Sequence, residues 1–283
     1  GDDVTRYLIA GAGGMLGHDL QAALAGRAVT ALDRRSLDIT DAEACLEAVG
    51  GHDVVINAAA YTAVDAAESD EEAARLVNAV GAENLARASA AHGAVMVQLS
   101  TDYVFAGDAT APYSEDAPLA PVSAYGRTKA DGERRVRAAH PDGAIIVRTA
   151  WLYGAHGPNL VSTMERLAGE RETLTVVDDQ RGQPTRTHDL AAQIVLMLDD
   201  GVRSGVLHGT SSGETTWLDF ARAIFRLHGW DEQRVQPVSS AEFVRPAPRP
   251  AYSVLGHDAW HRIGIAPIRP WHDALIDYLE NRA

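Results

Sequence analysis

Cysteine is almost absent from this chain of 283 residues, in which Cys45 is the single example. A lone cysteine cannot form an intramolecular disulfide, and no cysteine cluster is available for a structural zinc site. The eleven histidines show no H-E-x-x-H spacing, so the sequence predicts no metal centre. A G-x-S-x-G motif is also missing, which leaves hydrolysis by a serine nucleophile without support.

Long hydrophobic runs and positive charge are scarce as well. No apolar run approaches the roughly 20 residues of a membrane span, and residues 1–3 show no signal-peptide pattern, so we expect a cytoplasmic protein. The formal net charge is −14. Nucleic acid is not expected as a partner, because phosphate binding needs a basic face. An anionic ligand would have to be bound by locally placed arginines and helix N-termini.

Lysine is also rare: Lys129 is the only lysine, and the other 24 of the 25 Lys and Arg residues are arginine. Lys129 follows Tyr125 by four residues, and helix positions i and i+4 lie on one face. Arginine cannot replace a compact ammonium beneath a phenol. We expect this cation to lower the pKa of Tyr125 from about 10 towards neutrality, as a proton donor at pH 7 requires. The alternative is a solvated surface helix with an incidental tyrosine.

A glycine-rich turn follows the first apolar run. Gly11, Gly14 and Gly17 have a G-x-x-G-x-x-G spacing, which permits a tight turn, close approach to a pyrophosphate and close packing of a helix on a strand. Without a further feature, such a motif is also compatible with a plain strand-to-helix turn.

That further feature is Asp33, which ends the next apolar run about 20 residues after the glycines. An acidic side chain there can accept a hydrogen bond from an adenosine ribose hydroxyl, which favours NAD. Arg34 and Arg35 follow at once and can hold a 2′-phosphate, which favours NADP. Both cofactors stay open, and a solvated pair of loop arginines is the alternative.

Short apolar stretches alternate with amphipathic ones along the first half of the chain. Strands that alternate with helices predict a parallel sheet, so we expect an α/β fold with a Rossmann-type doubly wound sheet. The expected strands are residues 7–10, 29–32, 54–57, 95–99 and 144–148; the expected helices follow the glycine turn, start at a capping box T-D-A-E at 40–43, span about 71–92, and contain Tyr125.

Polar and small residues follow the third and fourth expected strands, where ligands bind in an open parallel sheet. Small side chains at 58–60 would let a cofactor backbone pass. The Thr101 hydroxyl can hydrogen-bond a substrate oxygen beside the Tyr125 phenol. Asp102 is either a coupled acid or the cap of a turn.

Regular alternation weakens beyond Gly154. We expect residues 1–155 to form most of a dinucleotide-binding domain and residues 156–283 most of a smaller, mixed α/β substrate-binding cap, with later segments returning to the first domain. The expected short strands are 174–177 and 206–208, and the expected helices are 160–168, 189–198, 217–227 behind a Thr215/Thr216 cap, 258–263 and 271–280.

These motifs, in this order, resemble the extended short-chain dehydrogenase/reductases. The similarity narrows to the dTDP-4-dehydrorhamnose reductase family and is spread over almost the whole chain. It rests on N-A-A-A-Y-T-A-V-D at 57–65, S-T-D-Y-V-F-A-G at 100–107, R-T-A-W-L-Y-G at 148–154, D-D-Q-R-G-Q-P-T at 178–185 and R-P at 249–250.

The resemblance implies an NAD(P)H-dependent reduction of the C4 keto group of a dTDP-4-dehydro-6-deoxy sugar. Tyr125 would donate a proton to the keto oxygen while a nicotinamide delivers hydride to C4. Lys129 would bind the nicotinamide ribose, and Thr101 takes a position where many relatives have serine. NADPH is the expected cofactor, with NADH possible.

The same resemblance carries further positions over to this chain. The implied cofactor-binding residues, besides the glycines, are Met15, Leu16, Asp33, Asp38, Ile39, Ala60, Tyr61 and Thr62. The implied sugar or nucleotide contacts are Val64, Asp102, Tyr103, Phe105 and Trp151, of which Trp151 would supply an apolar wall against the sugar.

Magnesium is associated with some members of the family, through acidic residues at a subunit contact. Asp19 matches one such position, but His188 stands where an acid would be wanted. This argues against a metal-linked dimer, and we expect a monomer or a homodimer without a metal.

A doubly charged diphosphate must bind this chain against its overall negative charge, so local cations must outweigh the average. Arg249 lies in the proline-stiffened segment R-P-A-P-R-P and loses little entropy on ordering. We expect it to clamp the diphosphate, with Gln183 and Thr185 as neutral helpers. A solvated loop residue is the alternative for Arg249.

A second class of function is a non-catalytic regulatory or scaffold relative that keeps the fold and nucleotide binding. Such a relative would be expected to lose the proton donor. The intact Thr101, Tyr125 and Lys129 favour the enzyme. The particular sugar and the C4 epimer formed stay open.

Overall fold

The computed structural model describes residues 4–282. Residues 1–3, on which the expected absence of a signal peptide rests, lie outside this range, as does residue 283. Within residues 4–282, no helix is both long and apolar enough to cross a membrane.

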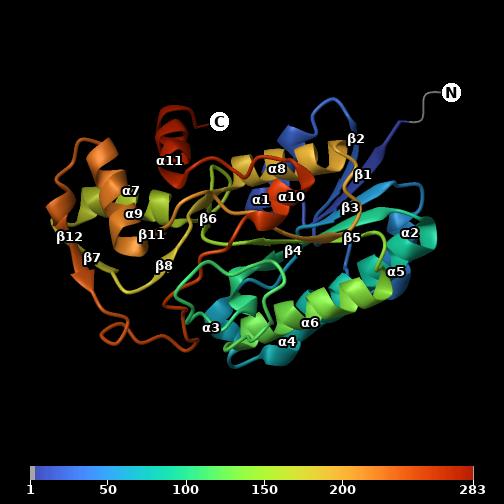
Figure 1. The fold of residues 1–283 in the computed structure, drawn as a ribbon, viewed down its shortest axis with the longest axis horizontal. Coiled ribbons are helices and arrows are strands. Elements are labelled where there is room, and N and C mark those ends of the chain that lie inside the picture. The colour runs from blue at the N-terminus through green and yellow to red at the C-terminus, as the bar shows by residue number, and fades with distance from the viewer. Residues whose placement is uncertain (1–3, 283) are drawn as a thin grey trace.

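A six-stranded parallel sheet forms the centre of the molecule (Figure 1). All its strand pairs are parallel, and the order is β10-β5-β4-β3-β1-β2. The expected α/β fold is confirmed. The strands are β1 (Arg6–Ala10), β2 (Ala28–Leu32), β3 (Val54–Asn57), β4 (Val95–Thr101), β5 (Ala144–Thr149) and β10 (Gly205–His208).

The strand order reverses between β1 and β3, because β2 lies outside β1 while β4 and β5 continue beyond β3. In doubly wound sheets the crevice at this reversal, at the carboxyl ends of the strands, is where ligands bind. The glycine turn leaves β1 there, and the Ala58–Ala60 segment leaves β3 there. The topology therefore brings the two expected cofactor-binding segments together.

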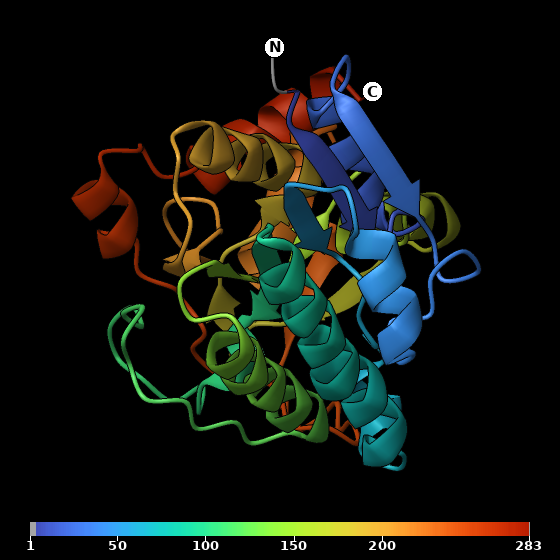
Figure 2. The same ribbon diagram turned by 90° about the vertical axis from the view of Figure 1, so that its right-hand side faces the viewer.

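Helices cover both faces of the sheet (Figure 1). One face packs against α1 (Met15–Ala23), α8 (Thr187–Asp199) and α10 (Asp258–Ile263), and the other against α2 (Ala42–Val49), α5 (Ala82–His92) and α6 (Ala124–Ala139). Successive strand residues point to opposite faces, so Ile9 joins the first core and Leu8 the second. Burial on both faces explains why the strands are continuous apolar runs. Figure 2 shows α5 and α6 side by side on their face.

The expected single helix at 71–92 is interrupted. It consists of α4 (Glu71–Arg75), a π-helical turn (Leu76–Gly81) and α5. The turn contains Asn78, whose amide accepts from Tyr61 N at 2.8 Å and donates to Tyr61 O and Thr128 Oγ1 at 3.1 Å. π-helical turns are frequent at functional sites. Here Asn78 of the turn ties the segment after β3 to α6.

The cap of α2 also differs from the expected one. Asp41, not Thr40, is the N-cap, because its Oδ1 accepts from Ala44 N at 3.1 Å. The Thr40 hydroxyl instead donates to Asp38 Oδ1 at 2.6 Å. Thr216 caps its helix as expected, accepting from Asp219 N at 3.1 Å.

The remaining elements form a second, smaller core. It lies between α7 (Leu160–Glu170), α9 (Trp217–Leu227) and α11 (Trp271–Glu280), which enclose Tyr153, Phe220 and Phe225. The small strands are β7 (Leu174–Val177) paired with β12 (Val235–Val238), β8 (Arg181–Gly182) with β11 (Thr215–Thr216), and β6 (Leu152–Tyr153) with β9 (Thr185–Arg186).

Three late elements, β10, α8 and α10, join the main sheet or pack on it. The strand expected at 206–208 is β10, which pairs with β5 at the sheet edge, and α8 packs on α1. Later segments therefore return to the sheet, while the division near residue 155 stays a prediction.

Gly132→Ala tests the close packing of α6 on the π turn. A Cβ at Gly132 would lie 2.1 Å from the backbone O of Asn78, so the two helices must move apart. We expect a loss of about 1–3 kcal/mol in the free energy of unfolding, measured by urea denaturation. Gly169→Ala in α7 is the control: a Cβ there meets nothing within 4 Å, so the stability should rise by about 0.5–1 kcal/mol. Equal effects of the two changes would contradict this account.

Candidate active site

Thr101 and Tyr125 meet where β4 ends against the start of α6, and Lys129 lies one turn further along this helix, hydrogen-bonded to Leu99 O. Ser123 caps this helix and accepts from Gly126 N at 3.0 Å. Gly126 is required there, because a Cβ would lie 2.3 Å from Tyr103 O. The Tyr103 and Tyr125 rings meet edge to face with centroids 5.4 Å apart. The strand end and the first turns of the helix are thereby held in direct contact.

The Thr101 hydroxyl is engaged on both sides. It donates to Asp102 Oδ1 at 3.0 Å and accepts from Tyr103 N at 3.1 Å. Asp102 is buried, which raises the pKa of its carboxyl to about 6 despite the hydrogen bond from Thr101. To donate to a substrate oxygen, Thr101 must therefore release Asp102, so the two residues act as a pair.

Lys129 is buried, and its Nζ donates to the backbone O of Leu99 at 2.8 Å. Burial lowers the pKa of Lys129 to about 8, while the charge of Glu133 opposes that shift. The ammonium form still predominates at pH 7.

The expected lowering of the Tyr125 pKa is wrong. Burial raises the pKa of Tyr125, and the nearby Asp102 carboxyl raises it further. The Lys129 ammonium is directed at Leu99 O. The phenol is therefore protonated at pH 7, but it is a weaker acid than the lowered pKa would have made it.

A buried ion pair lies one helical turn beyond Lys129. Glu133 and Arg148 are joined by Nη2–Oε1 at 2.8 Å and Nε–Oε2 at 3.0 Å, with side chains 2% and 3% exposed. Ser100 Oγ also donates to Glu133 Oε2, at 2.5 Å. Arg148 Nη1 donates to Glu115 O at 3.1 Å and lies 3.1 Å from His208 Nε2. This network fixes α6 to the ends of β4 and β5. Ser100 and Arg148 lie within motifs that carry the resemblance, whereas Glu133 lies in none of them.

The glycine turn has the form expected of a pyrophosphate site. Gly11 has a φ of +75°, and a Cβ on it would lie 2.4 Å from Ala59 N. A Cβ on Gly17 would lie 2.6 Å from Ala12 O. Gly14 is the N-cap of α1 and provides no side chain to cap the helix. The first N–H groups of α1 are therefore available to an anion. Met15 and Leu16 form the first turn of this helix.

Asp33 lies just beyond β2, at the same edge of the sheet. Its Oδ1 accepts from Arg35 N and Ser36 N, both at 3.0 Å, and from Ser36 Oγ at 3.2 Å. These hydrogen bonds, led by the one from Ser36 N, lower the pKa of Asp33. The Arg34 and Arg35 side chains are exposed and, within residues 4–282, form no ion pair. They remain available to an anion.

The other expected cofactor residues surround this edge. Ile39 is buried in the core against α2, whereas Asp38 is exposed and bonds to Thr40. Ala60 and Tyr61 are half-buried after β3, and Thr62 is exposed. Asn78 holds Tyr61 through its backbone, which fixes the path of the segment.

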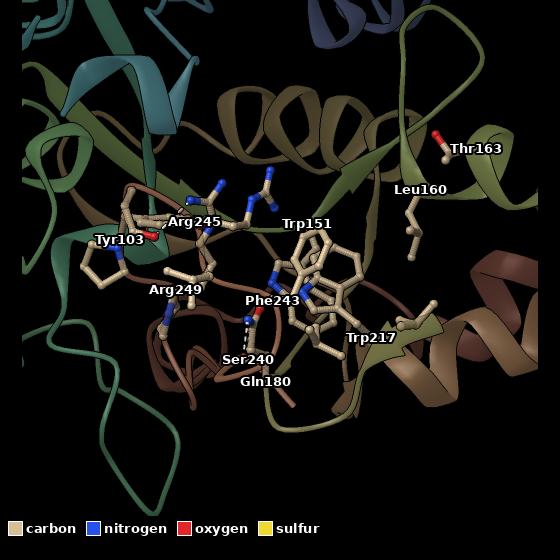
Figure 3. A pocket seen from close by; sticks show the side chains of 16 residues that line it. Tyr103, Trp151, Leu160, Thr163, Gln180, Trp217, Ser240, Phe243, Arg245 and Arg249 are labelled. Atoms are coloured by element: carbon tan, nitrogen blue, oxygen red, sulfur yellow. Dashed lines mark hydrogen bonds between the residues drawn. The ribbon is translucent and has the colours of Figure 1, made fainter. Parts of the chain in front are cut away.

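A pocket of about 660 Å³ lies beside Tyr103 (Figure 3). The Trp151 and Trp217 rings line it and stack with centroids 3.7 Å apart. Trp151 has a φ of 51°, a left-handed conformation that costs a side chain of this size of order 1–3 kcal/mol. Gly182 makes room for the indole, because a Cβ there would lie 2.7 Å from it. The expected Trp151 wall thus lies on the pocket, whereas Trp217 was not anticipated.

Arg249 also lines the pocket, but its guanidinium is paired with the Asp65 carboxylate. Its Nη1 donates to Asp65 Oδ1, and its Nη2 to Asp65 Oδ2 at 3.2 Å. Arg245, a second pocket residue, approaches the same carboxylate at 3.3 Å. Asp65 and Arg245 were missed as site residues, although Asp65 ends the 57–65 block and Arg245 opens the R-P-A-P-R-P segment.

Four residues expected to contact the substrate, Val64, Phe105, Gln183 and Thr185, have the following surroundings in the structure. Gln183 is buried, and its amide donates to Leu255 O at 3.1 Å and accepts from Leu255 N at 2.9 Å. Thr185 is buried and accepts from Ser211 N. Phe105 is buried and stacks on Tyr113 at 4.5 Å. Val64 is half-buried at the start of α3 (Val64–Ala67).

Asp19, the acidic residue considered for magnesium, forms a hydrogen bond within the protein. Asp19 is buried and accepts from Thr187 Oγ1 at 2.5 Å. Across residues 4–282 no group of His, Cys, Asp and Glu side chains is arranged to hold a metal ion.

A family model described as the RmlD substrate binding domain matches residues 5–283. The chain belongs to this family. The RmlD match covers both the main sheet and the smaller core, so it supports the resemblance seen in the sequence motifs.

Relatives agree with this membership in the RmlD family. The chain is 51% identical over 274 residues to a dTDP-4-keto-6-deoxy-D-glucose reductase of Streptomyces niveus, covering 95% of each chain. It is 50% identical over 280 residues to a dTDP-4-dehydrorhamnose reductase of Streptomyces griseus, covering 96% of this chain and 92% of the relative. The solved dTDP-4-dehydrorhamnose reductase of Bacillus anthracis strain Ames, in complex with NADP, superposes with a TM-score of 0.94 at 38% identity, covering 99% of this chain and 100% of that one.

Glu133→Gln tests the buried ion pair. The change leaves the Arg148 guanidinium buried without its counter-charge, and we expect a loss of about 3–5 kcal/mol in the free energy of unfolding. Asp131→Asn, which breaks a partly exposed pair with Arg135 on the same helix, should cost less than about 1 kcal/mol. Urea denaturation of both variants measures the difference. A Glu133→Gln variant as stable as Asp131→Asn would rule out the anchoring role of the pair.

Proposed function

We propose that this protein reduces the C4 keto group of a dTDP-4-dehydro-6-deoxyhexose with hydride from NADPH. The substrate is dTDP-4-dehydro-L-rhamnose, giving dTDP-L-rhamnose, or a closely related dTDP-4-keto sugar. The observation that supports the proposal is the position of Tyr125 beside Thr101 at the end of β4, with Lys129 one helical turn away and a pocket lined by two tryptophans next to Tyr103. The names of two relatives that are half identical to the chain support the same substrate class.

The residues at the switch point fit a dinucleotide. The N-terminus of α1, without a side-chain cap, suits the pyrophosphate, and Asp33 suits the adenosine ribose. Arg34 and Arg35 suit a 2′-phosphate, and the NADP in the related Bacillus anthracis structure supports this preference. NADPH, when bound, supplies the hydride that adds to C4.

Tyr125 protonates the oxygen that becomes negative as hydride reaches C4. Its phenol is protonated in the resting site, so it enters the reaction as the acid. As the charge develops, Thr101 turns its hydroxyl from Asp102 towards the same oxygen and stabilises it. Lys129, one turn along α6 from Tyr125 and hydrogen-bonded to Leu99 O, supplies a buried positive charge that stabilises the phenolate left after proton transfer.

A scaffold role without catalysis is the second candidate. Burying the Lys129 ammonium, 4% exposed with a single backbone acceptor in the described structure, costs folding free energy. A protein that only binds nucleotide can use Lys129 on the nicotinamide ribose, but it gains nothing from the Tyr125 phenol placed beside the Thr101 hydroxyl. The intact Thr101 and Tyr125 therefore favour the reductase.

Tyr125→Phe should lower turnover about 100- to 10,000-fold while NADPH affinity is kept, because only the donated proton is lost. Turnover is followed by NADPH absorbance with a dTDP-4-keto-6-deoxy sugar, and affinity by fluorescence titration. Tyr252→Phe, which removes a phenol near Glu214, is the control and should keep wild-type turnover. A Tyr125→Phe variant with more than about a tenth of wild-type turnover would exclude the acid role.

Neutralising Arg34 and Arg35 together should raise the Michaelis constant for NADPH much more than that for NADH. The two cofactors differ by the 2′-phosphate, and both side chains are exposed beside Asp33. Steady-state kinetics with each cofactor measure the change. An equal effect on both constants would place these arginines outside the phosphate site.

A further inference from the structure

Two arginines of one loop converge on a carboxylate from a distant part of the chain. Asp65 lies in α3, directly after residues 60–62, which are expected to contact the cofactor. Arg245 and Arg249 lie in the loop that follows β12. Asp65 Oδ1 accepts from Ala247 N at 3.1 Å, and both arginines approach its oxygens. Figure 3 shows the two arginine side chains on the pocket beside Tyr103.

The two arginines are not equally available to a ligand. Arg249 uses Nη1 and Nη2 on Asp65 and also donates from Nη1 to Ala247 O at 3.1 Å; its side chain is 14% exposed. Arg245 makes one contact with Asp65, through Nη2 at 3.3 Å, and its side chain is 49% exposed. A guanidinium has five N–H donors, so most of those on Arg245 remain for a ligand.

The loop that carries Arg245 is attached at two points. Ser240 N and Oγ donate to Asp179, and Gln180 Nε2 donates to Ser240 Oγ at 2.9 Å. At the other end, Asp65 holds Ala247 and Arg249. Phe243 and Val244, between these attachments, line the pocket with exposed side chains. The part of the loop that bears Arg245 therefore lies between two attached ends, with its side chains directed to the pocket.

We propose that Arg245 is the residue that binds the diphosphate of the sugar nucleotide, and that Asp65 and Arg249 together are positioning residues that hold it at the pocket. This inference rests on the proposed function. The diphosphate contact that the sequence predicted for Arg249 is thereby assigned to Arg245, because both terminal nitrogens of Arg249 already bind Asp65. Because Asp65 also follows the expected cofactor-binding segment, it joins the nucleotide-sugar pocket to that segment.

The three charges also explain how a chain of net charge −14 binds a dianion. Two guanidinium groups and one carboxylate leave one positive charge at the pocket, and the carboxylate is not among the residues that line it. The ligand therefore meets the arginines, with Asp65 behind them. Asp65 contributes orientation, since a bidentate pair has a defined geometry.

Calorimetry with dTDP and with thymidine tests the assignment to Arg245. Arg245→Ala should weaken dTDP binding about 10- to 100-fold, the effect of losing a charged hydrogen-bond donor, and leave thymidine binding unchanged. Arg87→Ala removes one positive charge from an exposed position on α5 and should leave both affinities unchanged. Equal dTDP affinity of Arg245→Ala and wild type overturns the proposal, as does an equal loss for dTDP and thymidine.

Asp65→Asn tests the positioning role. It removes a negative charge near the pocket, so a purely electrostatic role predicts tighter dTDP binding, whereas loss of orientation predicts weaker binding. We expect weaker binding, with a smaller effect in the Arg245→Ala background than in the wild type. Tighter binding, or the same effect in both backgrounds, overturns the positioning role of Asp65.

Two outcomes separate this inference from the proposed function. If the wild-type protein turns over a dTDP-4-keto sugar while Arg245→Ala binds dTDP normally, this inference alone is refuted. If the wild-type protein binds no dTDP, the proposed function is refuted as well.

Discussion

The attachment of α6 to the ends of β4 and β5 is the constraint on which the rest of the site depends. Lys129 reaches Leu99 O at the end of β4, and Glu133 reaches Ser100 and Arg148 one turn later. These buried polar contacts replace the solvation that the charges lose, and they require one register between helix and sheet. That register places the Tyr125 phenol next to Thr101.

Two further contacts join the site to segments that lie far away in the sequence. Asn78, in a π turn, holds the Tyr61 backbone and Thr128 of α6, so the segment after β3 and α6 share one anchor. Asp65, four residues after Tyr61, holds the loop of Arg245 and Arg249. The segment after β3 is thus tied both to α6 and to the loop that lines the pocket beside Tyr103.

Periodicity and motifs predicted the sheet and the glycine turn, because each is encoded locally. The roles of Thr101, Tyr125 and Lys129 stay a prediction. The π turn at 76–81 was not predictable, since it depends on the approach of Gly132 to Asn78 across two helices. Gln183 was expected to help Arg249 at the diphosphate, yet its side chain is buried and its hydrogen bonds go to Leu255. The roles of Arg245 and Arg249 depend on which arginine pairs with Asp65, about 180 residues away, and spacing along a chain carries no such information.

The central claim is that hydride passes to C4 of a dTDP-4-keto-6-deoxy sugar at the Tyr125 site. It is tested most directly with NADPH that carries deuterium at the transferred position. The nucleotide sugar is purified after turnover and examined by mass spectrometry and proton NMR. The account predicts one deuterium per product molecule, located at C4, with loss of the H4 signal. Product that retains a full H4 signal, or deuterium at another carbon, would contradict it.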